Sequence, residues 1–293
     1  MHYILPSDYI PKPLETLEEI SSKANFDLSE VEAEKQLKKL RRKLAKLQDK
    51  MYAHGKYGVL VCLQGMDTAG KDSLIREVFK DLNARGVVVH SFKTPTALEK
   101  RHDYLWRHYV ALPERGKFSV FNRTHYENVL VTRVHPNYIL GENIPKVEST
   151  DDITPGFWDN RFRQINDFER HISENGTVIF KFFLHISKEE QRQRLLRRLE
   201  NKSHQWKFSP ADLKERELWN LYQDCYKDIL NQTSKPHAPW YVIPSDDKVL
   251  SRLIVASVIY EVLSNYHDIQ EPQLDAETEA NIQFYKTKLS NEN

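Results

Sequence analysis

A glycine-rich segment near residue 65 has the spacing of a phosphate-binding loop. Two glycines with four residues between them are followed at once by a lysine in the segment Gly65-Met66-Asp67-Thr68-Ala69-Gly70-Lys71-Asp72-Ser73. Glycines let backbone N–H groups come close to phosphate oxygens, and a helix that begins at the loop adds partial positive charge. Lys71 supplies a mobile charge for the terminal phosphates. We therefore expect an anion cradle lined by Gly65, Thr68, Ala69, Gly70, Asp72 and Ser73.

Two positions depart from the usual loop. Asp72 follows the lysine where Ser or Thr normally binds Mg²⁺, and Ser73 comes one residue late. Asp67 lies inside the cradle, where a carboxylate 4 Å from a phosphate charge would be repelled by about 4 kcal/mol at an effective dielectric near 20. A cation between them reverses that sign. We predict that Asp67 is a Mg²⁺ ligand or takes the acceptor's proton; the alternative is that it caps the loop through the backbone.

A second polar cluster follows another apolar run, 118–121. Asn122 stands where a phosphate-loop enzyme usually offers an acid to the metal, and its amide oxygen can still bind Mg²⁺ or a water of that ion. Arg123 could clamp phosphoryl oxygens with two parallel hydrogen bonds, and Glu127 is the nearest carboxylate downstream. Parallel sheets place ligands at the carboxyl ends of their strands, which favours a site here. The alternative is an Asn turn beside an ion-paired arginine.

A third group is basic. Arg194, Arg197 and Arg198 stand at i, i+3 and i+4, so they share one helix face. Together with a second predicted helix that starts at Ser209-Pro210, they predict a helical lid at about 190–215. Closing it would bring arginines onto the transferring phosphoryl group and exclude water. The alternative is a solvated arginine face.

Four further cations lie near predicted strand ends and could line a groove for a long polyanion. They are Lys93, Arg133, Arg161 and Lys181. Of these, we assign Arg133 and Lys181 to ligand binding.

Strand-like and helix-like segments alternate along the chain, which predicts an α/β fold with a parallel sheet between two helical layers. We expect strands at 58–64, 87–92, 118–121, 178–184 and 240–243. We expect helices at 29–54, 71–85, 97–111, 157–174, 187–200, 210–231 and 247–265. We predict a surface arm over residues 1–28, one phosphate-loop kinase domain over 29–265 and a peripheral tail over 266–293. The Lys/Arg-rich face of the first helix is either solvated or a surface for a second copy or a polyanion.

The composition argues against several classes of protein. The 293 residues carry a net charge of +1 and a mean hydropathy of −0.65, without an apolar run long enough to cross a membrane. The first residues lack a secretory pattern, and two cysteines suit a reducing compartment, so we expect a cytoplasmic protein. The balanced charge and the lack of a recognisable RNA-binding motif argue against nucleic acid as the partner.

Taken together, these segments resemble the polyphosphate kinase 2 family on the thymidylate-kinase-like scaffold, over roughly residues 30–265. The resemblance rests on the loop 65–72, the segment Phe121-Asn122-Arg123-Thr124-His125-Tyr126-Glu127, the lid arginines, and the stretches 206–213 and 237–244. The Asn-Arg-x-His-Tyr-Glu sequence is similar to the subgroup called class III, whereas many members have Asp in place of Asn122.

The resemblance implies phosphoryl transfer between inorganic polyphosphate and nucleoside mono- and diphosphates, with AMP, ADP, ATP and GDP among the nucleotides. It also implies Mg²⁺, for which Mn²⁺ can substitute, and a homodimer or homotetramer. Glu127 would then face the acceptor nucleotide and help to admit a monophosphate, while Asp67 carries the charged part of the metal site. Two rivals stay open: an ATP-dependent nucleoside or nucleotide kinase on the same scaffold, and a phosphate-loop module that regulates a partner.

Overall fold

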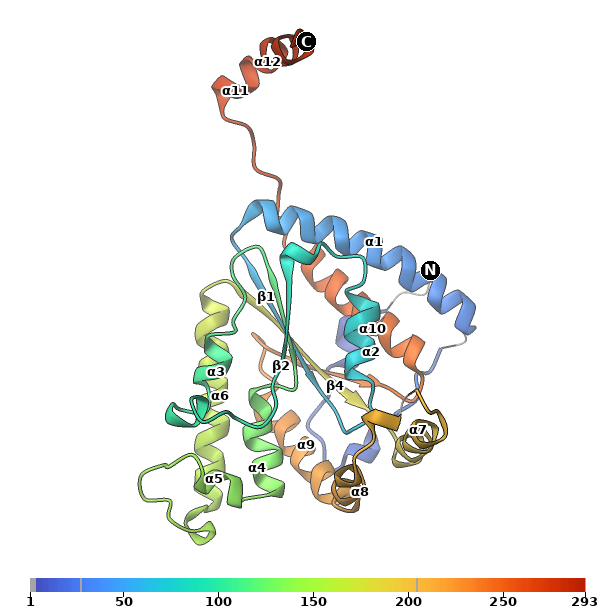
Figure 1. Cartoon of the computed structure of the whole chain (residues 1–293), viewed down its shortest axis with the longest axis vertical. Coiled ribbons are helices and arrows are strands. Elements are labelled where there is room, and N and C mark those ends of the chain that lie inside the picture. Colours follow the sequence, from blue (N-terminus) through green and yellow to red (C-terminus); the bar gives the residue numbers. More distant parts are fainter. Residues whose placement is uncertain (1–3, 27, 204, 293) are drawn as a thin grey trace.

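A computed structural model describes residues 4–26, 28–203 and 205–292. Its centre is a five-stranded sheet in the order β2-β3-β1-β4-β5, in which every neighbouring pair is parallel (Figure 1). The strands are β1 (Gly58–Gln64), β2 (Val87–Ser91), β3 (Phe118–Asn122), β4 (Thr177–His185) and β5 (Trp240–Pro244). All five predicted strands are therefore present, with ends within one residue of those expected.

Both faces of the sheet are buried along the central strands, whereas the edge strand β2 is partly exposed. Val59, Val61 and Leu63 of β1 join a large apolar cluster, whereas the alternate residues Leu60 and Cys62 join a second one. Helices α2 (Lys71–Val78) and α10 (Lys248–Ser264) pack on one face, and α1 (Glu30–His54) lies along α10. Helix α6 (Pro155–Glu174) packs against β4 on the other side, together with α9 (Trp219–Thr233). This is the three-layer α/β/α arrangement that the alternation predicted.

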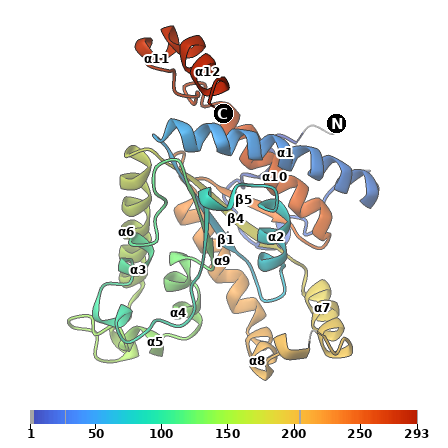
Figure 2. The ribbon, with the colours of Figure 1, turned by 45° about the horizontal axis from the view of Figure 1, so that its top comes forward.

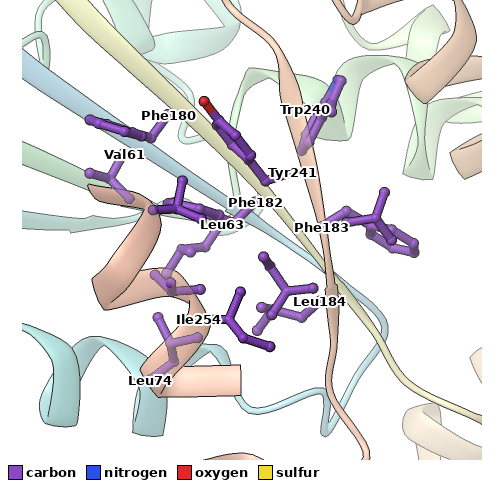
Figure 3. Close-up of a cluster of buried hydrophobic side chains, with 14 of the residues drawn as sticks. Val61, Leu63, Leu74, Phe180, Phe182, Phe183, Leu184, Trp240, Tyr241 and Ile254 are labelled. Carbon is purple, nitrogen blue, oxygen red and sulfur yellow. The ribbon is translucent and has the colours of Figure 1, made fainter. Parts of the chain in front are cut away.

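The larger cluster holds the strands together where they meet α10. Aromatic residues of β4 and β5 interleave with Leu63 and Ile254 (Figure 3). The rings of Phe182 and Tyr241 lie 5.6 Å apart between their centroids. Offset aromatic contacts of this kind add about 1 kcal/mol beyond the area that they bury. The centre of the sheet therefore gives the loops at its edge a rigid base.

The remaining helices are short or lie outside the core. They are α3 (Trp106–Tyr109), α4 (Val131–Val134), α5 (Asn137–Leu140), α7 (Lys188–Glu200), α8 (Pro210–Glu217), α11 (Ala276–Ala280) and α12 (Ile282–Ser290). No helix within the described ranges has the length and apolar character that crossing a bilayer requires.

Two helix predictions were too long, and a third joined two separate helices. Helix α2 ends at Val78 rather than 85, because the buried side chain of Gln48 accepts from the N–H of Asn83 and donates to its C=O, which turns the chain toward α1. The stretch 97–111 forms only a 3₁₀ turn and α3, since the Asp103 side chain accepts the N–H of Leu105 and starts a new turn. The stretch 210–231 is two helices that meet at Leu218.

The N-terminal segment is packed more deeply than a surface arm would be. The N-terminal segment does not simply lie on the surface: Leu14 and Leu17 are buried in the main core, and Leu14 exchanges both backbone hydrogen bonds with the side chain of Asn231. Residues 1–3 and 27 of that segment lie outside the described residues, as does 293 of the tail. The tail contains α11 and α12, which lie apart from the sheet and its helices in both views (Figures 1 and 2).

Candidate active site

The phosphate loop joins β1 to α2 at the carboxyl edge of the sheet. Gly65 has φ +153°, and a Cβ there would lie 2.9 Å from the carbonyl oxygen of Leu184, so the loop needs glycine at this position. Gly70 has φ +110° and precedes the first residue of α2. The Nζ of Lys71 donates to the carbonyl oxygens of Gly65 at 2.5 Å and Met66 at 3.3 Å. The lysine therefore lies across the cradle formed by its own loop.

Charged groups surround this lysine. Desolvation lowers the pKa of Lys71, and the carboxylates of Asp67, Glu127 and Asp72 oppose that shift. Three acidic groups therefore lie close enough to act on one ammonium group within a loop built for anions. The excess of negative charge is what a divalent cation would relieve.

Two polar contacts connect the loop to the end of β3. The guanidinium of Arg123 donates to Asp67 at 3.2 Å, and the side-chain amide of Asn122 donates to Asp72 at 2.5 Å. The side chains of Asp67 and Arg123 are 33% and 48% exposed, so both can meet a ligand. The two clusters that the sequence placed at separate strand ends thus form one site.

Glu127 belongs to the same site. It lies in a 3₁₀ helix, η5 (His125–Val129), capped by Thr124, whose hydroxyl accepts the N–H of Tyr126. Burial raises the pKa of Tyr226 on α9, and the charge of Glu127 adds to that shift. The half-buried Glu127 therefore acts on α9 as well as on Lys71 of the phosphate loop.

Arg194 does not have the place expected of a lid arginine. Its side chain is 4% exposed. Its five hydrogen bonds run to the carbonyl oxygens of Thr68, Ala69, Ser245 and Asp246 and to the carboxylate of Glu190. Since C=O and N–H point in opposite directions across a peptide, holding the loop carbonyls from behind favours amides that face the cradle. Arg194 thus supports the loop rather than closing over it, and this corrects its predicted catalytic place.

The sequence did not predict a second contact between α7 and the phosphate loop. The side-chain amide of Gln191 donates to the carbonyl oxygen of Asp67 at 3.1 Å. Gln191 is almost fully buried and also accepts from Arg216 of α8. A glutamine on a charged helix gives no signal of this role in a single sequence.

The other two lid arginines keep accessible positions. Arg197 is 57% exposed and pairs with Glu190, and Arg198 lies 3.4 Å from a carboxylate oxygen of Asp212 on α8. Burial raises the pKa of Asp212, and the charge of Asp67 adds to that shift, so α8 lies near the phosphate loop. His204, in the connection between α7 and α8, lies outside the described residues.

Comparison with known proteins agrees with this geometry. Residues 27–271 match the polyphosphate kinase 2 (PPK2) family. The chain belongs to this family. It is therefore an enzyme that carries out polyphosphate-driven phosphoryl transfer to nucleotides.

Individual relatives span most of this kinase. An ADP-polyphosphate phosphotransferase of Rhodopseudomonas palustris is 47% identical over 223 residues, 76% of each chain. An AMP/ADP-polyphosphate phosphotransferase of Meiothermus ruber is 44% identical over 82% of this chain and 84% of its own. The crystal structure of polyphosphate kinase 2 from Arthrobacter aurescens TC1 matches with a TM-score of 0.88 at 31% identity, covering 98% and 99% of the two chains.

One ligand-binding assignment in this kinase was wrong. Lys181 is fully buried and donates to Glu169 at 2.6 Å, to the Tyr126 hydroxyl and to the carbonyl of Thr233, so no donor of its ammonium is left for phosphate. Arg133 is ion-paired with Asp228 of α9 at 2.8 Å, and its assignment to ligand binding stays a prediction.

Of the other two groove candidates, Arg161 is buried and ion-paired with Glu142. The backbone carbonyl of Lys93 accepts from buried Arg107, but its side chain is exposed, so Lys93 stays a candidate. Sequence position near a strand end did not tell which way these side chains point.

The oxygen atoms of Asp67 and Asn122 fit a hard divalent cation. Because the amide nitrogen of Asn122 donates to Asp72, its oxygen is the atom that faces a ligand. No group of three His, Cys, Asp or Glu residues arranged to hold a metal occurs among the residues that the structure describes. Such a cation would therefore be shared between few protein oxygens and the phosphates themselves, as Mg²⁺ commonly is.

Proposed function

We propose that this kinase is a magnesium-dependent phosphotransferase that uses inorganic polyphosphate to convert AMP to ADP and ADP to ATP, and that also accepts guanine nucleotides. The observation that carries the proposal is the pairing of Asp67, inside an anion loop, with Arg123 at 3.2 Å. A carboxylate in that place suits a site where a cation joins two phosphate-bearing substrates. The names of the Rhodopseudomonas and Meiothermus relatives support ADP and AMP as acceptors.

The donor end is the phosphate loop. The terminal phosphates of polyphosphate would lie against the loop amides and the first turn of α2, with Lys71 moving from the carbonyls of Gly65 and Met66 onto phosphoryl oxygens. Phosphoryl transfer spreads charge over three equatorial oxygens, so positioned cations supply most of the catalysis. Arg123, Arg197 and Arg198 are the arginines placed to meet that charge.

The acceptor end lies toward Glu127. A nucleotide phosphate held between η5 and Arg123 would attack in line with the donor end. Glu127 would face the acceptor and favour a monophosphate, in keeping with a class III-like enzyme. Asp67 and Asn122 would hold Mg²⁺, which neutralises phosphate charge when bound and for which Mn²⁺ can substitute.

The architecture around the site fits the same proposal. Residues 29–265 form the kinase domain, and the lid is the part of 190–215 beyond Arg194. We further propose that the enzyme is cytoplasmic and acts as a homodimer or homotetramer, with polyphosphate and nucleotides as its partners and no role in nucleic-acid binding.

The decisive experiment supplies polyphosphate with AMP or ADP in separate reactions, without ATP, and follows the product nucleotides. We expect ADP from AMP and ATP from ADP when Mg²⁺ is present, and neither when it is removed. Transfer from ATP but not from polyphosphate would instead identify an ATP-dependent nucleotide kinase. A matched reaction with GDP tests the guanine acceptor.

A further inference from the structure

A buried ion pair lies beneath the acceptor side of the site. The Nζ of Lys181 on β4 and the carboxylate of Glu169 on α6 are 2.6 Å apart, and both side chains are fully buried. Removing two charges from water is costly, and such a pair often contributes no net stability compared with apolar residues. Stability alone therefore does not explain why this ion pair lies in the core.

The pair is bonded to the segment that carries the site residues. The Tyr126 hydroxyl accepts from Lys181 at 2.8 Å and donates to Glu169 at 2.7 Å, while Nε2 of His125 lies 3.1 Å from the same carboxylate. Lys181 also donates to the carbonyl of Thr233 on α9 at 2.7 Å. One network thus joins β4, α6 and α9 to residues 125 and 126.

The charged residues on either side of His125 and Tyr126, which are Arg123 and Glu127, act on the phosphate loop. Arg123 contacts Asp67, and Glu127 acts on Lys71. His125 and Tyr126 are fully buried, whereas Arg123 is half exposed. Holding the two inner side chains therefore fixes the direction of the two outer ones.

The backbone here needs such support. Arg123 has φ +61°, a left-handed conformation that is strained for a non-glycine residue and persists only where its surroundings impose it. On the next residue, the Thr124 hydroxyl accepts from the side chain of Gln64 at 3.1 Å, directly before the phosphate loop. The strained arginine is thus held between the phosphate loop and the buried network.

We propose that Tyr126, Glu169 and Lys181 are positioning residues that hold Arg123 and Glu127 in register with the phosphate loop, so that they set the binding of the acceptor nucleotide without touching it. This inference rests on the proposed acceptor role of Glu127. The donor cradle is bonded through Lys71, Gln191 and Arg194, outside the network.

The test is Tyr126→Phe, which keeps the ring and removes the hydroxyl that joins the two charges. We expect the KM for AMP and ADP to rise at least fivefold, with the KM for polyphosphate within twofold of wild type. The matched control is Ser119→Ala, which removes another buried hydroxyl bond, to the carbonyl of Ala111, on the strand that leads into the site. It should leave both KM values unchanged even if the melting temperature falls.

A double variant, Glu169→Gln with Lys181→Met, removes both charges together. It provides a second test of the inference in case the Tyr126→Phe variant does not fold. It should show the same rise in the KM for the acceptor alone. Unchanged acceptor KM values in either folded variant, or equal shifts for donor and acceptor, would overturn the inference. Failure of the proposed function looks different, because wild-type enzyme would then transfer nothing from polyphosphate to AMP or ADP.

Discussion

Replacing Arg194 by lysine separates the two roles of the arginines on α7. Lysine keeps the positive charge but has three donors on one atom, whereas Arg194 makes five hydrogen bonds that reach two loop carbonyls, two carbonyls after β5 and Glu190. At least two of these bonds must be lost. The carbonyls of Ala69 and Ser245 are buried, so they would find no water in place of a lost bond.

The size of the effect follows from those contacts. Hydrogen bonds to a charged group contribute roughly 1.5–3 kcal/mol each, so losing two lowers the free energy of unfolding by about 3–6 kcal/mol. At roughly 2–4 °C per kcal/mol, the melting temperature of Arg194→Lys should fall by about 6 °C or more. Arg197→Lys is the matched control, because Arg197 is 57% exposed with one ion pair, and its stability should change by about 0.5 kcal/mol or less.

Thermal denaturation followed by circular dichroism measures the difference, and the transfer assay runs beside it. We expect Arg194→Lys to lose stability and Arg197→Lys to lose turnover at unchanged stability. If Arg194→Lys melts within 2 °C of the wild type, the support of the loop by Arg194 is not what the contacts indicate.

Four further outcomes are expected. Lys71→Ala and Asp67→Asn should each lower kcat by roughly a hundredfold or more with the circular dichroism spectrum intact, since each removes a charged group from the transfer site; near-normal turnover in either would contradict the site. Glu127→Asn should lower kcat/KM for AMP more than for ADP, and an equal loss would remove its selectivity role. EDTA should abolish transfer, and adding Mg²⁺ or Mn²⁺ in excess should restore it; activity that survives EDTA would refute the metal. Burial raises the pKa of Cys225 to about 11 and holds that of Cys62 well above its usual range, so the folded enzyme should not react with a thiol reagent at pH 8, whereas the urea-unfolded chain should show two thiols.

The sheet could be predicted because its signals are local. A short, wholly apolar run such as 58–64 suits a strand buried on both faces, and the glycines after it require the turn that follows. The partners at the ends of β1 and β3 were predictable for a similar reason, since parallel strands end at one edge of the sheet. Asp67 and Arg123 meet there as that rule implies.

The direction in which an individual side chain points could not be predicted, because it depends on residues far away in the sequence. Lys181 pairs in register with Cys62, so its side chain points to the same face as that cysteine, toward the interior beneath the site. Only the pairing register reveals this. For Arg194, helical spacing correctly grouped the three arginines but could not say that the first of them meets carbonyls of the loop.

The predicted helix lengths were wrong where residues far away in the sequence contact the helix end. Gln48, more than thirty positions earlier, holds Asn83 and stops α2. The burial of Leu14 and Leu17 likewise depends on a surface formed by residues far along the chain. No window of neighbouring residues contains that information.

The contacts of Gln191 and Arg194 divide α7 into two mechanical parts. Its first two turns are joined to the phosphate loop and to the end of β5, so they move with the sheet as one body. Helix α8 is bonded back to these turns, because Arg216 donates to the carbonyl oxygen of Lys188 and to the side chain of Gln191. A movement of α8 that widens the entrance for a long polyphosphate chain would therefore have to break both bonds of Arg216, and the ion pair of Arg198 and Asp212 would be the outer contact between the two helices.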